Sequence, residues 1–358
     1  MTKHHKSILI QIIKKSKTGL FSSIYILLCF FIAIFCYALA PDNTSAANNM
    51  HLEIHSKPPG FNILMLQIPR ATDSKKTGVI SWLLHGKNNI YDEIPITSFT
   101  INNNTLEIIK YADGLPKTYT KQQFNNDNFE NYIQQKNFVL GTDKYGRDLL
   151  SRLLIGTRIS FFIGFVAVFI SLLIGIPIGA IAGYFGGKVD TFIMWLINIT
   201  WSIPTLLLVI AITLALGKGF WQVFIAVGLT MWVEVARVVR GQVISTKQQQ
   251  YVEAAKALGF SDLRIIFNHI LPNITAPIIV ISAANFAAAI LIESGLSFLG
   301  IGAQPPTPSW GAMIKNHYNY IILGKPFLAL IPGLAIMSLV MAFMLLGNKL
   351  RDVLDVKN

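Results

Sequence analysis

Charge is scarce in this chain. Asp, Glu, Lys and Arg make up 13% of its 358 residues, against roughly 25% in an ordinary soluble domain. Hydrophobic residues make up 53%, and they gather in long runs, which argues against a soluble fold. The net charge of +12 comes without a long basic run or a patch that interleaves basic and aromatic residues. The composition therefore argues against nucleic-acid binding as well.

Cysteine and catalytic motifs are equally scarce. The two cysteines, Cys29 and Cys36, stand seven residues apart, about 10 Å along a helix, which exceeds the reach of a disulfide. The chain has no zinc-ligand cluster, no G-x-S-x-G elbow and no G-x-x-x-x-G-K-[ST] phosphate loop. The nearest match to that loop has Ala182 and Val189 at two required positions. We therefore expect no catalysis, and in particular no ATP hydrolysis, from this chain.

Long uncharged runs dominate the rest of the sequence. Each of them reaches the ~20 residues that cross a hydrocarbon layer ~30 Å thick. They cover residues 20–41, 159–187, 191–217, 273–292 and 326–348. The pattern predicts an all-α polytopic membrane protein.

A sixth crossing is less evident, because only a short uncharged stretch precedes Glu234. A helix over residues 219–239 has to continue through Glu234 and Arg237, which stand at i and i+3 and are predicted to pair. Without this crossing, the N-terminus and the segment around residue 260 would lie on opposite sides of the membrane. We therefore predict six transmembrane helices.

The distribution of Lys and Arg predicts the orientation. Basic residues concentrate before the first run, between the fourth and fifth spans and after the last, which places both termini in the cytoplasm. The first run also resembles a signal peptide. Its apolar stretch is longer than the usual 7–15 residues of such a peptide, and Pro41 follows the small residues at its end. We expect a retained anchor.

A polar segment separates the first run from the others. Its alternating stretches FNILMLQI and SFTINNNTLEIIKY, with turn signals between them, predict a small β-rich domain outside the membrane. His51 and His55 flank Glu53 in an order that is not the H-E-x-x-H zinc motif, so we expect a surface strand and no metal. The predicted division is 1–19 for a basic cytoplasmic N-terminus, 20–41 for the first helix, 42–140 for the extracytoplasmic insert and 141–358 for the remaining membrane domain.

The most informative stretch is residues 251–273, a charged insert between apolar runs. Tyr251, Ala254, Ala255 and Leu258 form an apolar stripe on a short helix, and Gly259 supplies the residue that tolerates positive φ at a helix end. A second helix is predicted to start at Ser261-Asp262, with the Ser hydroxyl as its cap. It repeats the stripe and ends at Leu271-Pro272-Asn273. The pattern predicts a compact helical knob. The second stripe consists of Leu263, Ile266, Phe267 and Ile270.

This stretch resembles the EAA loop of ABC-importer permeases, the cytoplasmic element that docks on the ATPase subunit. The residues that carry the resemblance are Glu253, Ala254, Ala255, Gly259, Leu271 and Pro272. Two further stretches, GTDKYGRDLLSRLLIGTR from Gly141 and LSFLGIGAQPPTPSWGAMI from Leu296, are similar to the second permease of dipeptide and oligopeptide importers. His269 stands where the general pattern has Ile and the peptide branch commonly has His. Within the first of these stretches, Asp148 and Arg152 are predicted to pair at i and i+4.

The resemblance implies a non-catalytic permease subunit of an ATP-driven importer in a bacterial inner membrane, with the coupling loop at about 247–273. It implies four kinds of partner: a second permease subunit, either a homologue or a second copy, two cytoplasmic ATPases, an extracytoplasmic binding protein and the lipid bilayer. No cofactor is expected on this chain, since ATP would be hydrolysed by partners. The cargo stays open between dipeptides, longer peptides, nickel complexes and peptide antibiotics.

An ion-coupled secondary transporter is the alternative from a different class. Such proteins place coupled ionisable groups and broken helices near the middle of the membrane. Glu293, at the end of the fifth predicted span, is the one acid that fits, and no buried charge network accompanies it. Glu293 itself is predicted either to act in the pathway or to form a structural pair.

Two further patterns fall within the apolar runs. Gly175, Gly179 and Gly183 repeat every four residues and allow another helix to approach closely, either within this chain or from a second permease. The sequence NITWSIP places polar side chains and a helix-breaking proline in the third run, which is tolerated where they face protein or water. Asn198, Ser202 and Pro204 are predicted either to line the path or to take part in contacts between helices.

Overall fold

The computed structural model describes residues 16–70, 78–102, 104–124, 127–217 and 219–355. Two compact units divide the chain. One comprises the described residues up to Phe30, with Ser160–Gln304 and the described residues from Leu334 onward. The other comprises Phe31–Ile159 and Pro305–Gly333. Each unit is described by itself.

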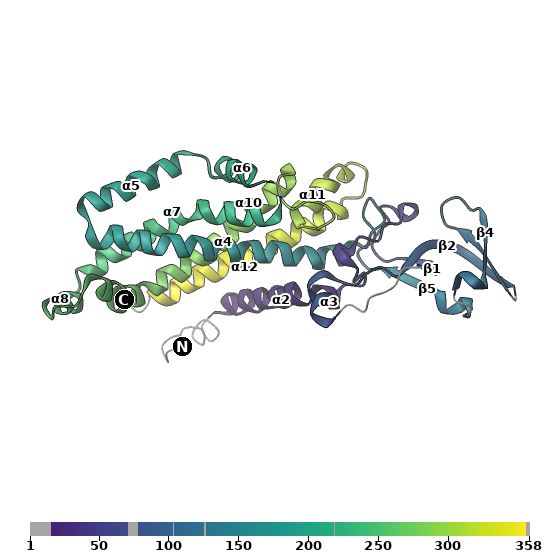
Figure 1. Ribbon diagram of the computed structural model, residues 1–358, viewed down its shortest axis with the longest axis horizontal. Coiled ribbons are helices and arrows are strands. Elements are labelled where there is room, and N and C mark those ends of the chain that lie inside the picture. Colours follow the sequence, from purple (N-terminus) through teal and green to yellow (C-terminus); the bar gives the residue numbers. More distant parts are fainter. Residues whose placement is uncertain (1–15, 71–77, 103, 125–126, 218, 356–358) are drawn as a thin grey trace. The chain divides into compact units, whose positions relative to one another are not determined.

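Long helices make up most of the structure (Figure 1). Five helical stretches among the described residues are long and apolar enough to cross a membrane, and a bent pair makes a sixth if it is counted as one span. This confirms the all-α membrane fold with a β-rich insert. The helices are α2 (Lys17–Leu39), α3 (Val79–His85), α4 (Leu149–Phe185), α5 (Gly187–Ser202), α6 (Thr205–Leu216), α7 (Phe220–Lys247), α8 (Gln250–Ala257), α9 (Asp262–Ile265), α10 (Thr275–Leu299), α11 (Trp310–His317) and α12 (Phe327–Asp355).

The third predicted span is not one straight helix. Helices α5 and α6 are bent by 91° at the break between them. Ile203 has the extended backbone (φ −93°, ψ 126°) that a following proline favours, and Pro204 brings no N–H to continue the helix. The NITWSIP sequence therefore marks a sharp bend.

The weakest predicted span is a single continuous helix. Helix α7 runs through Glu234 and Arg237 without a break. The predicted ion pair between these two residues is wrong, because no ion pair joins them in the described part of the chain. The guanidinium of Arg237 instead lies 3.8 Å from the ring centroid of Trp201 on α5, where a cation–π interaction holds it.

The glycine stripe of α4 lies against α7 of the same chain. A Cβ built on Gly175 would lie 2.7 Å from the carbonyl oxygen of Trp232, and one built on Gly183 would lie 2.7 Å from that of Arg240. A Cβ on Gly179 would overlap the backbone of Ala236. Only residues without a side chain allow two helices to meet this closely.

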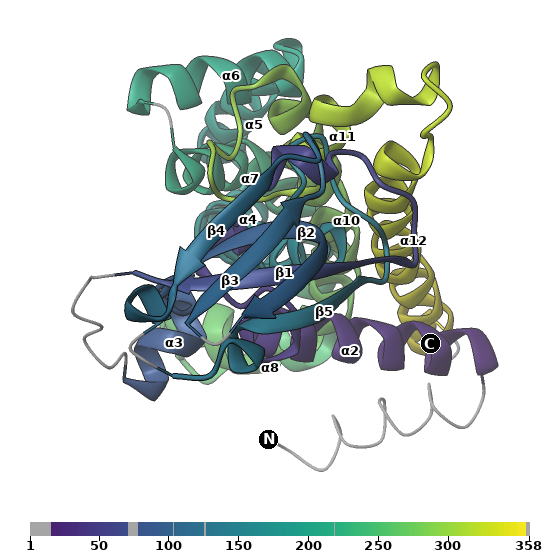
Figure 2. The ribbon, with the colours of Figure 1, turned by 90° about the vertical axis from the view of Figure 1, so that its right-hand side faces the viewer.

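The polar segment folds as a five-stranded antiparallel sheet in the order β4-β3-β2-β1-β5 (Figure 2). Strands β2 and β3 form a hairpin whose last pair is Asn102 with Thr105, at the predicted INNNT turn. The prediction of a strand around His51 is wrong: Leu52–Ile54 is a single 3-10 turn and His51 is buried. The strands are β1 (Phe61–Pro69), β2 (Tyr91–Asn102), β3 (Thr105–Lys110), β4 (Pro116–Thr120) and β5 (Ile133–Phe138).

The predicted pair of Asp148 with Arg152 is also wrong. The Asp148 carboxylate accepts hydrogen bonds from the backbone N–H of Ser151 at 2.8 Å and from its hydroxyl. Arg152 turns to Asp143 (3.7 Å) and to the carbonyl oxygen of Ala46 (3.1 Å). All of these polar side chains are buried, so the motif forms a buried network and not a surface helix bridge.

Candidate coupling segment and transport pathway

Helix α8 ends in a glycine turn that its sequence dictates. Gly259 has φ +79°, a value that glycine adopts without a steric cost. Its N–H donates to the carbonyl of Lys256 at 2.9 Å, and the N–H of Phe260 donates to that of Ala255 at 3.2 Å. These two bonds make a Schellman motif. The motif turns the chain sharply and places α9 directly after α8.

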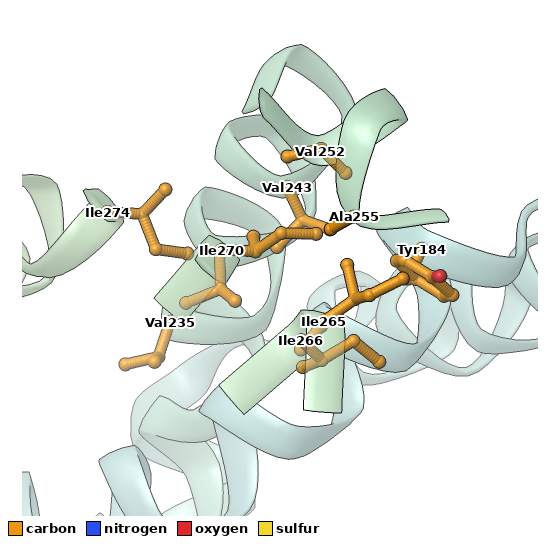
Figure 3. Packing of buried hydrophobic residues seen from close by; sticks show 11 residues of the cluster. Tyr184, Val235, Val243, Val252, Ala255, Ile265, Ile266, Ile270 and Ile274 are labelled. Atoms are coloured by element: carbon orange, nitrogen blue, oxygen red, sulfur yellow. The ribbon is translucent and has the colours of Figure 1, made fainter. Parts of the chain in front are cut away.

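The two short helices share a core with the long helices around them (Figure 3). Val252 and Ala255 of α8 are buried together with Ile265 of α9 and, in the turns that follow, Ile266 and Ile270. Side chains from α4 and α7 also belong to this cluster, so residues 247–273, the candidate coupling segment (below, the coupling segment), are packed firmly against these helices. The side chains from α4 and α7 are Ala180, Tyr184, Val235, Val239 and Val243.

The two predicted stripes do not form one buried face. Ala255, Ile266 and Ile270 are buried, whereas the remaining large members point outward. Their exposed fractions are 42% for Tyr251, 73% for Leu258, 65% for Leu263 and 60% for Phe267. We call these four residues the exposed apolar face of the coupling segment.

The predicted end of the second helix is wrong. After α9, a π-helical turn (Ile266–Ile270) and a 3-10 turn (Leu271–Ile274) lead directly into α10, and the helical stretch runs unbroken over Asp262–Leu299. Pro272 does not stop it, because it lies in the first turn of the 3-10 segment, where its missing N–H loses no hydrogen bond. The coupling segment is thus continuous with a long apolar helix.

The predicted cap of the second helix is wrong as well. Ser261 has the extended backbone of a cap residue, but its hydroxyl makes no capping hydrogen bond. The neighbouring Asp262 accepts a hydrogen bond of 2.6 Å from the hydroxyl of Tyr184. Lys247 at the end of α7 donates to the carbonyl oxygen of Tyr184. Tyr184 and Lys247 thus help to fix the position of the segment. No local sequence pattern predicted this role for either residue.

His269 and Asn273 brace the segment from its other side. The His269 ring stacks on Phe260, with ring centroids 5.7 Å apart. The side-chain amide of Asn273 donates to the carbonyl oxygen of His269 at 2.6 Å and to the hydroxyl of Tyr251 at 3.1 Å. His269 therefore packs across the glycine turn.

Glu253 lies beside a wide cavity of about 540 Å³. Two lysines, Lys247 and Lys256, line the same cavity, so the region combines one acid with two basic groups. Ala254 is exposed on α8. The residues that carry the sequence resemblance therefore include both buried and exposed positions.

The residues predicted for the transport path lie at separate places in the structure. Asn198 and Ser202 are exposed on α5, and Pro204 forms the bend. Glu293 lies 1% exposed on α10 and accepts a hydrogen bond of 2.6 Å from the hydroxyl of Ser297. A small cavity at the bend is lined by other residues, among them Glu234, which sequence reasoning treated only as an obstacle to a membrane span.

Comparison with known proteins shows the family of the chain. The family model described as binding-protein-dependent transport system inner membrane component matches residues 175–356. The dipeptide transport system permease protein DppC of Alkalihalophilus pseudofirmus is 36% identical over 307 residues, which are 85% of this chain and 98% of that protein. The chain belongs to the inner-membrane components of binding-protein-dependent transport systems, and it is a multi-pass permease subunit of an ABC importer.

Other relatives match a shorter part. The glutathione transport system permease protein GsiD of Pectobacterium atrosepticum is 41% identical over 61% of this chain and 72% of that protein. The di/tripeptide permease DppC of Pseudomonas aeruginosa is 42% identical over 62% of this chain and 73% of that protein. A chain of the MetNI methionine ABC transporter is 19% identical, with a TM-score of 0.47 over 56% of this chain and 96% of that chain.

Proposed function

We propose that this chain forms one half of the translocation pathway of a peptide importer. It pairs with a second permease subunit, receives cargo from an extracytoplasmic binding protein and is driven by two cytoplasmic ATPase subunits. Both of its termini are cytoplasmic. The chain hydrolyses no ATP and binds no cofactor. The peptide cargo is supported by the relatives, which are dipeptide, di/tripeptide and glutathione permeases.

The exposed apolar face of the coupling segment carries the proposal. Leu258, Leu263 and Phe267 are each at least 60% exposed, although they belong to a short, charged segment whose other face is fully packed. Exposed apolar side chains gathered on one short segment outside the apolar spans are suited to a protein partner. A rigid helical knob with an apolar surface is suited to transmit the movement of an ATPase to the long helices behind it.

The coupling segment must also be rigid if it is to transmit movement. Its connections to α10 and α4 provide this rigidity. The segment is joined covalently to α10 through an unbroken helical stretch. It is also joined non-covalently to α4 by the hydrogen bond from Tyr184 to Asp262. A displacement of the knob therefore moves both a span that follows it and one that precedes it. This is the coupling that an importer needs between ATP hydrolysis and the pathway.

The test uses the complete complex in proteoliposomes, with the binding protein outside and ATP inside. Leu263→Glu and Phe267→Glu place a charge on the apolar face without changing the buried one. We expect each to reduce co-purification of the ATPase at least tenfold and to abolish ATP-dependent dipeptide uptake. Leu115→Glu, at a residue 62% exposed on the insert, is the matched control and should retain both. Undiminished ATPase binding in the two variants would contradict the docking role.

A further inference from the structure

A cavity of about 120 Å³ opens at the bend between α5 and α6. Helices α7 and α10 contribute the rest of its walls. The lining includes the polar residues Thr200, Thr205 and Thr230 and the indole of Trp201. Among the described residues that line it, Glu234 is the one charged group. An acid that is exposed in the isolated chain therefore faces a cavity lined by apolar helices.

No basic side chain among the described residues neutralises this acid. Among the described residues no hydrogen bond or ion pair reaches Glu234. Arg237, one turn further along α7, stacks on Trp201 at 3.8 Å, and Arg240 pairs with Asp190 of α5. An ionisable group within a membrane domain is costly unless a partner compensates its charge, and it commonly marks a substrate or ion path.

The other walls supply no compensating charge either. Helix α6 has no charged residue. On α10 the charged residue beside the cavity-lining Ile292 is Glu293, an acid that is buried and bonded by Ser297. Lys188 and Asp190 are at the opposite end of α5 from the bend. The charge that faces the cavity is therefore negative.

Two of the three threonine hydroxyl groups in the cavity wall are left as acceptors. The Thr200 hydroxyl donates its proton to the carbonyl oxygen of Leu196 at 3.0 Å, and the Thr230 hydroxyl donates to that of Val227 at 2.9 Å. A hydroxyl has one proton and two lone pairs, so both oxygens keep only acceptor capacity. A carboxylate and two hydroxyl acceptors match a primary ammonium group, which has three donors and no acceptor.

We propose that this cavity is a subsite of the transport pathway that receives the protonated primary amine of the cargo, with Glu234 as its counter-charge. The volume sets the size of the group. A cavity of about 120 Å³ suits an ammonium group and the carbon beside it, but not a whole peptide. The inference rests on the proposed function, and for a peptide the amine is its amino terminus.

The test measures dipeptide uptake by the complete complex in proteoliposomes between pH 6.5 and 9. We expect Glu234→Gln to lower uptake at least tenfold at pH 7. The ratio of wild-type to variant uptake should fall toward one as the amine, with a pKa of ~7.7–8.0, loses its proton. Both proteins use the same binding protein, so its own pH dependence cancels in this ratio. Glu234→Asp should retain most of the uptake, and Glu107→Gln, on an exposed position of β3, should equal the wild type.

Two outcomes would overturn the proposal. Unchanged uptake by Glu234→Gln would mean that the cavity lies off the pathway, and a loss of equal size at every pH would mean that Glu234 pairs within the assembly. Failure of the wild-type complex to import dipeptides would instead overturn the peptide cargo. The subsite is then tested without cargo: ethylammonium should raise the thermal midpoint of the solubilised wild-type complex but not that of Glu234→Gln. An equal rise in both would reject it.

Discussion

The hydroxyl of Tyr184, at the end of α4, donates a 2.6 Å hydrogen bond to the carboxylate of Asp262, in the first turn of α9. These residues are 78 positions apart. Tyr184 is 3% exposed, and the ammonium groups of Lys247 and Lys256 lie 5.3 and 5.4 Å from its ring centroid. The bond therefore links the coupling segment to a span with which it has no direct chain connection.

Removal of this hydroxyl should weaken coupling more than assembly. Hydrogen bonds to charged groups are worth about 1.5–3 kcal/mol, and the core around the ring stays intact in Tyr184→Phe. We expect normal membrane insertion and ATPase binding, with the amount of cargo moved per ATP reduced severalfold. Tyr320→Phe, in the turn Tyr318–Ile321, is the control. The measurement is uptake and ATP hydrolysis in the same proteoliposomes, and an unchanged ratio would refute the link.

Two glycines offer a matched test of the contact between α4 and α7. Gly179→Ala forces a methyl group into the backbone of Ala236, whereas Gly241→Ala meets nothing within 4 Å. We expect Gly179→Ala to lower the thermal midpoint of the complex and its yield. Gly241→Ala should be neutral or slightly stabilising, since alanine is favoured over glycine by about 1 kcal/mol within a helix. Equal midpoints for the two variants would show that α4 and α7 separate in the membrane.

The predicted orientation can be tested with single cysteines. Gln122 in the insert and Ile322 after α11 are exposed, as is Ser261 in the coupling segment. Cysteines at Gln122 and Ile322 should react with an impermeant thiol reagent in intact spheroplasts, and one at Ser261 only after lysis. The native Cys29 and Cys36 are buried and provide the background. Labelling of Ser261→Cys from outside would mean that α7 does not cross the membrane.

A substitution of Glu293 distinguishes a gating role of this carboxylate from a structural role. Its carboxylate accepts a hydrogen bond from Ser297, whose hydroxyl oxygen in turn accepts one from the N–H of Ala303 at 3.2 Å. The acid therefore secures the turn after α10. We expect Glu293→Gln to lower the thermal midpoint of the complex together with uptake. A variant with the wild-type midpoint but no transport would favour a role in the pathway.

The insert should lose stability in acid because of Glu93. Burial raises the pKa of this group, but hydrogen bonds from His51 (3.2 Å) and Lys136 (2.9 Å) and their charges lower it from 4.5 to about 2. A depressed pKa gives stability that is complete above pH 4.5 and is lost as the pH falls toward 2. The effect is at most about 3 kcal/mol.

Glu93→Gln should remove that pH dependence and lower stability at pH 7. Protease resistance of the insert in the purified complex, followed from pH 7 to pH 3, measures both effects. Glu130→Gln, exposed in the turn Phe129–Tyr132, is the control and should follow the wild type. Identical acid profiles for Glu93→Gln and the wild type would exclude Glu93 as the cause.

Local patterns were sufficient for much of the fold. The β2–β3 hairpin formed at its Asn-rich turn, and Gly259 ended α8 with positive φ, because turn chemistry depends on a few neighbouring residues. Predictions of which partner a charged side chain contacts failed more often, even where the spacing was local. Arg152 pairs with Asp143 and not with Asp148, and Arg237 stacks on Trp201 and does not pair with Glu234. A long side chain can reach several partners, and only tertiary packing selects one of them.

The sequence by itself determined the apolar spans, the β-rich insert and the glycine turn between two short helices. The thickness of a bilayer and the conformational limits of glycine act on contiguous residues, so these features can be recognised without a partner. Only the tertiary structure decided which apolar side chains of the coupling segment are buried and which are exposed. It also decided that Tyr184 holds Asp262 and that Glu234 faces a cavity in which no described basic residue pairs with it. These results depend on how separate helices meet, which no local pattern specifies.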